Sequence, residues 1–251
     1  MKELNKRIRI AAVSYLNTKP LTYAFEHGAM SDSIELSFEY PSKVASDLLN
    51  DRVDVGLVPI AVIPLLNESY IISDYCISTE GEVASVCLFS QVPLNEIETI
   101  KLDYQSKTSV ALLKILLKYH WKLSPNLTEA SEGYETTIKG STAGLVIGDR
   151  ALVQRSTSTY IYDLGLAWKE MTGLPFVFAA WVANKILPSA FIHTFNEATS
   201  QGLQHIDKIV ADLNFNEYDM KKYYTININY QLNKDKIAAM QKFTELLSHI
   251  E

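Results

Sequence analysis

Two short segments combine hydroxyl groups with a lysine directly before a predicted helix. Residues 14–19 carry Ser, Tyr, Asn, Thr and Lys side chains, and residues 106–109 carry three hydroxyls and one lysine. Free backbone N–H groups and a partial positive charge gather at a helix N-terminus, so each segment could bind an anion such as a carboxylate. Alternatively, each segment simply caps its helix. The candidate caps are Asn17, Thr18, Ser106 and Thr108.

Two further polar features lie within or directly after apolar runs. Ser85 lies inside the predicted strand 83–89, where a hydroxyl is costly unless it finds a hydrogen-bond partner, which could be a backbone group or a ligand. Gly148 and Asp149 follow the predicted strand 143–147, where Asp149 could cap a helix or face a ligand. Both features leave a structural and a ligand-binding interpretation open.

Other common catalytic arrangements are missing from the sequence. It contains no G-x-S-x-G elbow for a nucleophilic serine and no G-x-G-x-x-G or Walker loop for a nucleotide. Cys76 and Cys87 do not form a Cys-x-x-Cys pair, and neither lies near a histidine at metal-ligand spacing. We therefore expect neither a cofactor nor a metal.

Composition and charge narrow the class of protein and its partners. The chain of 251 residues is 47% hydrophobic and 21% charged, which indicates a globular protein with a packed core. Lys and Arg total 23 against 29 Asp and Glu, and no basic stripe is present, so nucleic acid is not an expected partner. The N-terminal apolar run is interrupted by Arg9, and no run approaches the roughly 20 residues that cross a membrane. We expect a cytoplasmic protein without a membrane partner.

The chemistry-bearing segments lie between alternating strands and helices. The N-terminal half predicts strands at 8–13, 34–40 and 53–58, and each is followed by a helix or helical turn. A further strand–helix series runs from residue 100 to residue 182, and the chain after Pro188 is mostly helical, with helices at 189–213, 217–224 and 234–250. This alternation is typical of an α/β fold with mainly parallel strands.

The order of elements indicates two lobes with a ligand cleft between them. Residues 1–90 and 183–251 would form a discontinuous first lobe, and residues 91–182 an inserted second lobe. Extended segments near 89–92 and 178–182 would act as the hinge. The two hydroxyl-rich helix starts then lie in different lobes, so a ligand with two anionic groups would bridge them.

Several motifs occur in an order that resembles a known enzyme family. The most specific is Tyr-Leu-Asn-Thr-x-Pro-Leu, which starts at Tyr15 within the stretch 13–21. The others are 54–59, Gly81 with 85–90, 102–109, 145–152 and 162–176. From about residue 7 to about residue 183 the chain resembles the chorismate dehydratases of the futalosine route to menaquinone. Beyond residue 188 the similarity is one of helical pattern only.

The resemblance implies a type II periplasmic-binding-protein-like fold used as a cytoplasmic, cofactor-free lyase. Its substrate would be chorismate, which is converted to 3-[(1-carboxyvinyl)oxy]benzoate and water. By this resemblance Asn17 and Ser85 hold the C4 hydroxyl of chorismate and assist its departure. The implied substrate-binding residues are Ser14, Tyr15, Thr18, Gly81, Ser106, Lys107, Thr108, Ser109, Gly148 and Asp149.

The proton acceptor is not evident from these residues. Neither an amide nor a neutral serine is a competent base near neutral pH, so our hypothesis is that the enolpyruvyl carboxylate of the substrate takes the C3 proton. Asp149 is the alternative on the protein. Lys107 stands where the family pattern has Arg; it either binds a carboxylate as a point charge or faces solvent, because lysine cannot form a bidentate fork.

Two other functions are also compatible with these residues. A solute-binding protein for a small aromatic or dicarboxylic acid would share the expected fold. The sister enzyme that makes 1,4-dihydroxy-6-naphthoate is the second alternative, although its Ser-Pro-Cys-Pro-Asn-Asp-like start loop is missing from this chain.

Overall fold

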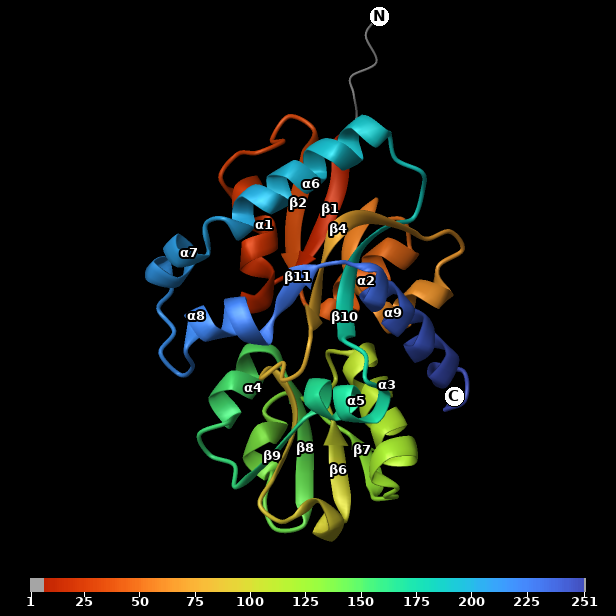
Figure 1. The fold of residues 1–251 in the computed structure, drawn as a ribbon, viewed down its shortest axis with the longest axis vertical. Helices are drawn as coiled ribbons and strands as arrows, with labels where there is room; N and C mark the ends of the chain where they lie inside the picture. Colours follow the sequence, from red (N-terminus) through yellow and green to blue (C-terminus); the bar gives the residue numbers. More distant parts are fainter. Residues whose placement is uncertain (1–6, 251) are drawn as a thin grey trace, which may run out of the picture. The chain divides into compact units, whose positions relative to one another are not determined.

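The computed structural model describes residues 7–250, which divide into two compact units. Unit 1 comprises the chain up to residue 77 together with 178–214 and 230–233. Unit 2 comprises 78–177, 215–229 and the chain from residue 234 onward. Figure 1 follows the chain through both units in sequence colours.

This division differs from the expected lobes at three places, one of which is the segment 178–182, expected in the second lobe and found in unit 1. Strand β5 (Val86–Ser90) pairs on both sides within the second sheet, with β8 (Thr142–Ile147) and β9 (Tyr160–Asp163). Because all five residues of β5 are buried in that sheet, the expected hinge at 89–92 begins inside unit 2. The chain after residue 188 also contributes to both units, whereas all of it was expected in the first lobe.

Unit 1 is built on a six-stranded sheet with the order β11-β4-β10-β3-β1-β2. Strand β1 is parallel to its neighbours β2 and β3, and β10 is antiparallel to β3. The predicted first strand is confirmed at its exact bounds. In chain order the strands are β1 (Ile8–Val13), β2 (Ile34–Glu39), β3 (Val55–Pro59), β4 (Tyr70–Thr79), β10 (Phe176–Ala183) and β11 (Asn229–Gln231).

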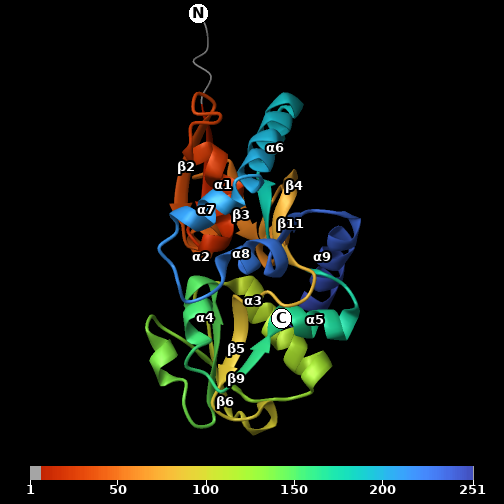
Figure 2. The ribbon, with the colours of Figure 1, turned by 60° about the vertical axis from the view of Figure 1, so that its left-hand side comes forward.

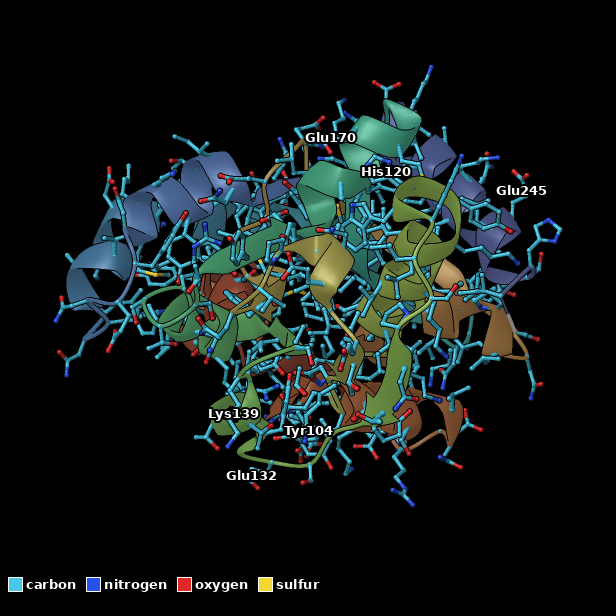
Figure 3. All side chains as sticks on the ribbon, turned by 90° about the horizontal axis from the view of Figure 1, so that it is seen from below. Tyr104, His120, Glu132, Lys139, Glu170 and Glu245 are labelled. Carbon is cyan, nitrogen blue, oxygen red and sulfur yellow. The ribbon has the colours of Figure 1, made fainter. Side chains whose placement is uncertain are left out.

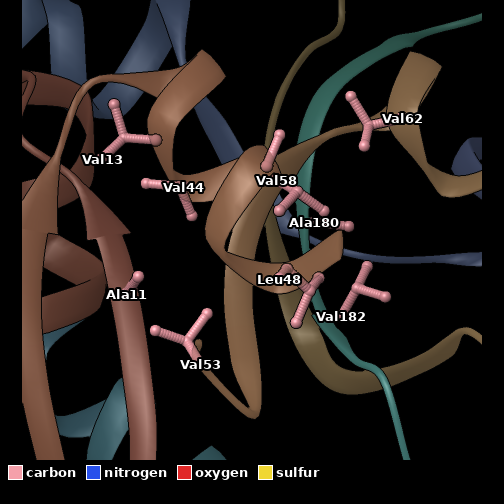
Figure 4. Close-up of a cluster of buried hydrophobic side chains, with 10 residues drawn as sticks. Ala11, Val13, Val44, Leu48, Val53, Val58, Val62, Ala180 and Val182 are labelled. Carbon is pink, nitrogen blue, oxygen red and sulfur yellow. The ribbon is translucent and has the colours of Figure 1, made fainter. Parts of the chain in front are cut away.

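Helices cover both faces of this sheet. Helices α1 (Lys19–Glu26) and α6 (Ser189–Leu203) lie side by side in Figures 1 and 2, and α2 (Pro41–Leu49) packs against β3. Small and branched apolar side chains from β1, α2, β3 and β10 form the cluster drawn in Figure 4. The single helix expected over 189–213 is instead broken into α6 and α7 (Ile206–Asp212).

Unit 2 is built on a five-stranded sheet with the order β7-β6-β8-β5-β9. Its remaining strands are β6 (Thr99–Leu102) and β7 (Asn126–Glu129). Helix α3 (Lys107–Ile115) continues into the π-helix η4 (Leu116–Trp121), which packs against α5 (Leu164–Thr172). At that contact His120 lies beside Glu170 (Figure 3), with 3.5 Å between Nε2 and Oε2.

The C-terminal helices also differ from the expected pattern. Helix α9 (Lys234–Leu247) packs against α3 within unit 2. The helix expected over 217–224 is a single turn, α8 (Met220–Lys222), followed by the π-helix η6 (Tyr223–Asn227). The helical region therefore extends to residue 227, three residues beyond its expected end. None of the helices within residues 7–250 combines the length and apolar character that crossing a bilayer requires.

Candidate functional site

The Ser14 loop begins directly after β1, at the carboxyl end of the parallel strands of unit 1. Ser14 is exposed, and its backbone N–H donates to the carbonyl of Glu39 over 2.9 Å. Tyr15 is half-buried and packs against the apolar cluster of this unit. Asn17 is half-buried, and its backbone carbonyl accepts a 2.9 Å hydrogen bond from the hydroxyl of Tyr230. The loop is thus anchored mainly through backbone atoms.

Thr18 occupies the cap position of α1 without capping it through its side chain. Its hydroxyl makes no hydrogen bond to the helix N–H groups and lies 3.4 Å from Asn17 Oδ1. Pro20 instead occupies the first turn, where its missing N–H leaves no bond unmade. The simple helix-cap interpretation therefore describes the position of Thr18 but not its hydrogen bonding.

In unit 2, three candidate segments and the start of α5 meet at one edge of the sheet. Strands β6 and β8 are parallel, and β5 is antiparallel to β8 and β9. The carboxyl ends of β6, β8 and β9 and the amino end of β5 therefore lie at the same edge. This edge brings together Ser106–Ser109, Gly148–Asp149, the start of α5 and Ser85.

Ser85 precedes β5 rather than lying inside the strand, which corrects the expected placement. The residue before it, Ala84, is fully buried and adopts φ of 63°, a left-handed conformation that L-residues rarely adopt. Asp163 holds this turn, because its carboxylate accepts the N–H groups of Val83 (3.1 Å) and Ala84 (2.8 Å). The same carboxylate caps α5.

The side chain of Ser85 is fully buried and hydrogen-bonded. Its Oγ accepts a 2.7 Å hydrogen bond from the hydroxyl of Tyr223, and it lies 3.5 Å from the carbonyl of Val83. The backbone carbonyl of Ser85 accepts the N–H of Gly148 over 2.8 Å. Two of the predicted site segments are therefore joined directly, which the sequence did not indicate.

Gly148 and Asp149 form the first turn of α4 (Gly148–Gln154). Gly148 has φ of 64°, which favours glycine at this position. Ile147 is the cap residue, so the expectation that Asp149 caps the helix is wrong. Burial raises the pKa of the nearby Tyr224 phenol, and the charge of Asp149 raises it further. Asp149 is thus an acidic group next to the segment that carries Tyr223.

Ser106 caps α3 through its side chain, so of the two candidate caps, Ser106 and Thr108, the first is confirmed. Its Oγ accepts the N–H of Ser109 over 3.2 Å and lies 3.0 Å from the Ser109 hydroxyl. Thr108 and Ser109 are buried, whereas the side chain of Lys107 is exposed. The structure therefore places the hydroxyls of this segment in the protein and the lysine at its surface.

A buried carboxylate ties this helix start to α4. Asp103 Oδ2 accepts hydrogen bonds from Arg150 (2.7 Å) and from the hydroxyl of Tyr134 (2.9 Å), and the Asp103 side chain has no exposed surface. Asp103 Oδ1 accepts the backbone N–H of Gln105 over 2.8 Å. Burial raises the pKa of Asp103, while the charge of Arg150 lowers it. Arg150, which follows Asp149 in α4, thus fixes the loop before Ser106.

Gly81 has a role in the turn between β4 and β5. Its N–H donates to Thr79 Oγ1 over 3.2 Å. A side chain at Gly165 would bring a Cβ atom to 2.6 Å from the Gly81 carbonyl, so glycine is required at the start of α5 for this close approach. Gly81 therefore lies near the same edge of unit 2 as Ser85.

Sequence reasoning missed three residues that organise these segments. Asp163 and Arg150 lie within quoted motifs but received no role, and Tyr223 lies where the family resemblance had ended. An acid at the end of a strand and directly before a helix is a detectable signal for a cap, but no local pattern marks a tyrosine as a partner of a distant serine. Across residues 7–250, no group of three or more His, Cys, Asp or Glu side chains is placed to hold a metal ion.

The fold belongs to the periplasmic-binding-protein-like class, as expected. A structure from Archaeoglobus fulgidus has a TM-score of 0.74 at 16% identity and covers 97% of both chains. A Candida albicans protein described as having the generic periplasmic binding protein structural fold has a TM-score of 0.63 at 13% identity, covering 97% of this chain and 90% of that one. These similarities show the fold alone.

Sequence comparison then defines the family. Residues 8–249 match the model of the menaquinone biosynthesis family, so the chain belongs to that family. A chorismate dehydratase of Thermus thermophilus is 27% identical, over 93% of this chain and 92% of that protein. A chorismate dehydratase of Campylobacter jejuni is 25% identical, over 93% of this chain and 94% of that protein. Residues beyond 188 are thus part of the family match as well.

Proposed function

We propose that this protein is a chorismate dehydratase that converts chorismate to 3-[(1-carboxyvinyl)oxy]benzoate and water in menaquinone biosynthesis. The observation that carries the proposal is the end-to-end match to proteins with this activity, over 93% of the chain in both cases. The family match over residues 8–249 supports the same pathway. A biosynthetic function of this kind favours the cytoplasm as its location.

The reaction suits a site made of hydroxyls, amides and helix starts. Loss of the C3 proton and the C4 hydroxyl makes the ring aromatic, which supplies much of the driving force. The protein must then position the substrate, move a proton and assist the leaving group. In this proposal Asn17 and Ser85 hold the C4 hydroxyl. Two contacts support these roles, because each side chain lies in an anchored segment: Asn17 in a loop fixed by Tyr230, and Ser85 in a turn fixed by Asp163.

A carboxylate of the substrate is proposed to bind at the start of α3. The N-terminus of this helix offers backbone N–H groups, and the buried hydroxyls of Ser106, Thr108 and Ser109 lie beside them. The Asp103–Arg150 pair fixes the loop that leads into this helix. The remaining contacts are proposed for Ser14, Tyr15, Thr18, Gly81, Lys107, Gly148 and Asp149.

The proton acceptor is proposed to be the enolpyruvyl carboxylate of the substrate, held against C3. A chorismate analogue that lacks this carboxylate should react far more slowly, and full activity with it would contradict the proposal. Asp149 is the competing base. An Asp149→Asn variant with unchanged kcat would exclude it, whereas a loss of about 100-fold would favour it.

The direct test is to incubate the purified protein with chorismate alone and to follow the benzoate product by chromatography and mass spectrometry. We expect product, and we expect Asn17→Ala and Ser85→Ala to lower kcat by roughly 100-fold each, as for loss of one polar group that stabilises a transition state. Asn67→Ala is the matched control, since Asn67 is exposed in unit 1. Thermal stabilisation by chorismate without product would instead indicate a solute-binding protein.

A further inference from the structure

Tyr223 belongs to residues 215–229, which are part of unit 2. Most of that unit, residues 78–177, comes much earlier in the sequence. The Tyr223 hydroxyl donates to Ser85 Oγ over 2.7 Å, and neither side chain has exposed surface. The two residues are 138 positions apart. This contact is the short side-chain hydrogen bond of Ser85, because its other neighbour, the carbonyl of Val83, lies 3.5 Å away.

The stretch that carries Tyr223 is held against the turn around Ser85 at other points too. Asn227 Nδ2 donates to the carbonyl of Glu82 over 3.2 Å, and Asn227 Oδ1 accepts the hydroxyl of Tyr218 over 3.1 Å. Arg155 donates to the carbonyl of Ala84 over 3.1 Å. The guanidinium carbon of Arg155 also lies 5.6 Å from the centre of the Tyr218 ring. The turn at residues 82–85 and the stretch 215–229 are therefore joined by several contacts.

The directions of the two hydrogen bonds of Ser85 Oγ decide whether its hydroxyl can donate to a ligand. A serine hydroxyl has one proton to donate and can accept through its lone pairs. When Tyr223 donates to Ser85 Oγ, the proton of Ser85 is left facing a carbonyl at 3.5 Å, which is the limit of a useful hydrogen bond. A hydroxyl that accepts a hydrogen bond also becomes a stronger donor. Ser85 is thereby prepared to donate to an oxygen that develops negative charge.

We propose that Tyr223 is a positioning residue that fixes the Ser85 hydroxyl as a hydrogen-bond donor to the departing C4 hydroxyl of chorismate. This inference rests on the proposed dehydratase function and assigns a role in it to the C-terminal part of the chain. Tyr223 acts through Ser85 and not on the substrate. Its effect must therefore disappear when the Ser85 hydroxyl is removed.

A double-mutant cycle tests this dependence. Tyr223→Phe, Ser85→Ala and the double variant are assayed for chorismate turnover beside the wild type. Each single change removes one oxygen atom and no carbon, so the surrounding packing is retained. We expect Tyr223→Phe to lower kcat by about tenfold with little change in KM, as for one hydrogen bond lost at the reacting group. In the Ser85→Ala background the same change should have no further effect.

Tyr162→Phe is the matched control, because Tyr162 lies in β9 of the same unit, where it pairs with Leu88 and its ring lies beside that of Trp121. It should leave kcat unchanged. Unfolding temperatures of all variants identify losses that come from instability, and an unstable variant is assayed at a lower temperature at which it is folded. Equal tenfold losses in both backgrounds, or no loss from Tyr223→Phe, would overturn the role of Tyr223.

The wild type separates this inference from the proposed function. If the wild type makes no benzoate product, the dehydratase proposal fails and the role of Tyr223 falls with it. If the wild type is active but Ser85→Ala is equally active, the dehydratase stands and the Tyr223–Ser85 assignment is wrong. If the wild type is active and the cycle is non-additive, both are supported.

Discussion

Ser14 and Asn17 of unit 1 are held through backbone hydrogen bonds, whereas Ser85 and Ser106 of unit 2 are held through buried side chains. In the Ser14 loop the anchors are the Ser14 N–H and the Asn17 carbonyl, and within residues 7–250 the amide nitrogen of Asn17 donates no hydrogen bond. In unit 2 the hydroxyls of Ser85 and Ser106 are already engaged by Tyr223 and Ser109. The amide of Asn17 is thus more available to a ligand than the hydroxyls of Ser85 and Ser106, which are more firmly oriented.

The buried carboxylates of the two units differ in the number of cations that they contact. Asp54 of unit 1 has two cationic partners, Arg9 at 2.7 Å and Lys185 at 2.6 Å. Asp103 of unit 2 is more deeply buried and has, among residues 7–250, one cationic partner, Arg150 at 2.7 Å, beside a hydrogen bond from the Tyr134 hydroxyl. A buried charge that loses its only counter-charge is costly, whereas one that keeps a second partner is not. The contrast therefore makes quantitative predictions for each unit.

The largest expected effect comes from Arg150→Ala. This change leaves the Asp103 carboxylate buried without a cation, and we expect it to lower the free energy of unfolding by about 3 kcal/mol. Arg9→Ala should lower it by only about 1 kcal/mol, because Lys185 stays on Asp54. Urea unfolding of both variants measures the difference. Arg150→Ala/Asp103→Asn should recover part of the loss, and equal losses for the two arginine variants would remove the contrast.

The α/β pattern was largely predictable because its signals are local. Buried β-branched runs and the residues after them gave β1 at its observed bounds and β2 and β3 within two residues. The turn at Ser85 was not predictable, since Ala84 takes a left-handed conformation that depends on Asp163, 79 residues away. The Tyr223 contact spans 138 residues and has no local signal at all. Sequence motifs thus located the candidate residues, but not the residues that orient them.

Acidification should affect the two units in opposite directions. Burial tends to raise the pKa of Asp54, but hydrogen bonds from Arg9 and Lys185 outweigh it, so the net pKa lies below the ordinary value. The stability that Asp54 gives is therefore present above about pH 4 and is lost as the pH falls. Burial raises the pKa of Asp163 in unit 2 above its ordinary value. The folded state therefore takes up this proton more readily than the unfolded state, and the contribution of Asp163 to stability grows as the pH falls through the raised pKa.

Hydrogen exchange at a series of acidic pH values checks this prediction unit by unit. Peptides from β1 and β3 should lose protection at a higher pH than peptides from β5 and β8, and Asp54→Asn should remove much of the pH dependence in unit 1. The Asn variant keeps the size of the side chain, so it serves as the matched control. Simultaneous loss of protection in both units would contradict the assigned directions.

A smaller effect distinguishes the two helix starts. Ser106→Ala removes a side-chain cap that accepts the Ser109 N–H, and we expect a loss of about 1 kcal/mol in the free energy of unfolding. Thr18→Val removes a hydroxyl that does not cap α1 and whose 3.4 Å contact with Asn17 is weak, so about 0.5 kcal/mol is expected. Thermal unfolding of the two variants gives the order. A larger loss from Thr18→Val would show that the Ser14 loop depends on side chains after all.

The smallest expected effect concerns the two lysines at these helix starts, Lys19 and Lys107, which are both exposed. Lys19→Gln and Lys107→Gln should each change the free energy of unfolding by less than about 0.5 kcal/mol. If Lys107 attracts a substrate carboxylate as a point charge, Lys107→Gln should raise KM for chorismate about threefold. That rise should shrink as salt is added, because an exposed charge is screened. The exposed Lys139→Gln is the control.

The Lys107→Arg variant decides between the two interpretations of this position. Arginine can form a bidentate fork with a carboxylate that lysine cannot, so a lysine that contacts the substrate should be improved by the exchange and KM should fall. A lysine that only faces solvent gives the same KM in the Lys, Arg and Gln forms at every salt concentration. In that case the carboxylate would depend on the buried hydroxyls and the N–H groups of α3 alone, and unit 2 would recognise its ligand without a cation at this helix start.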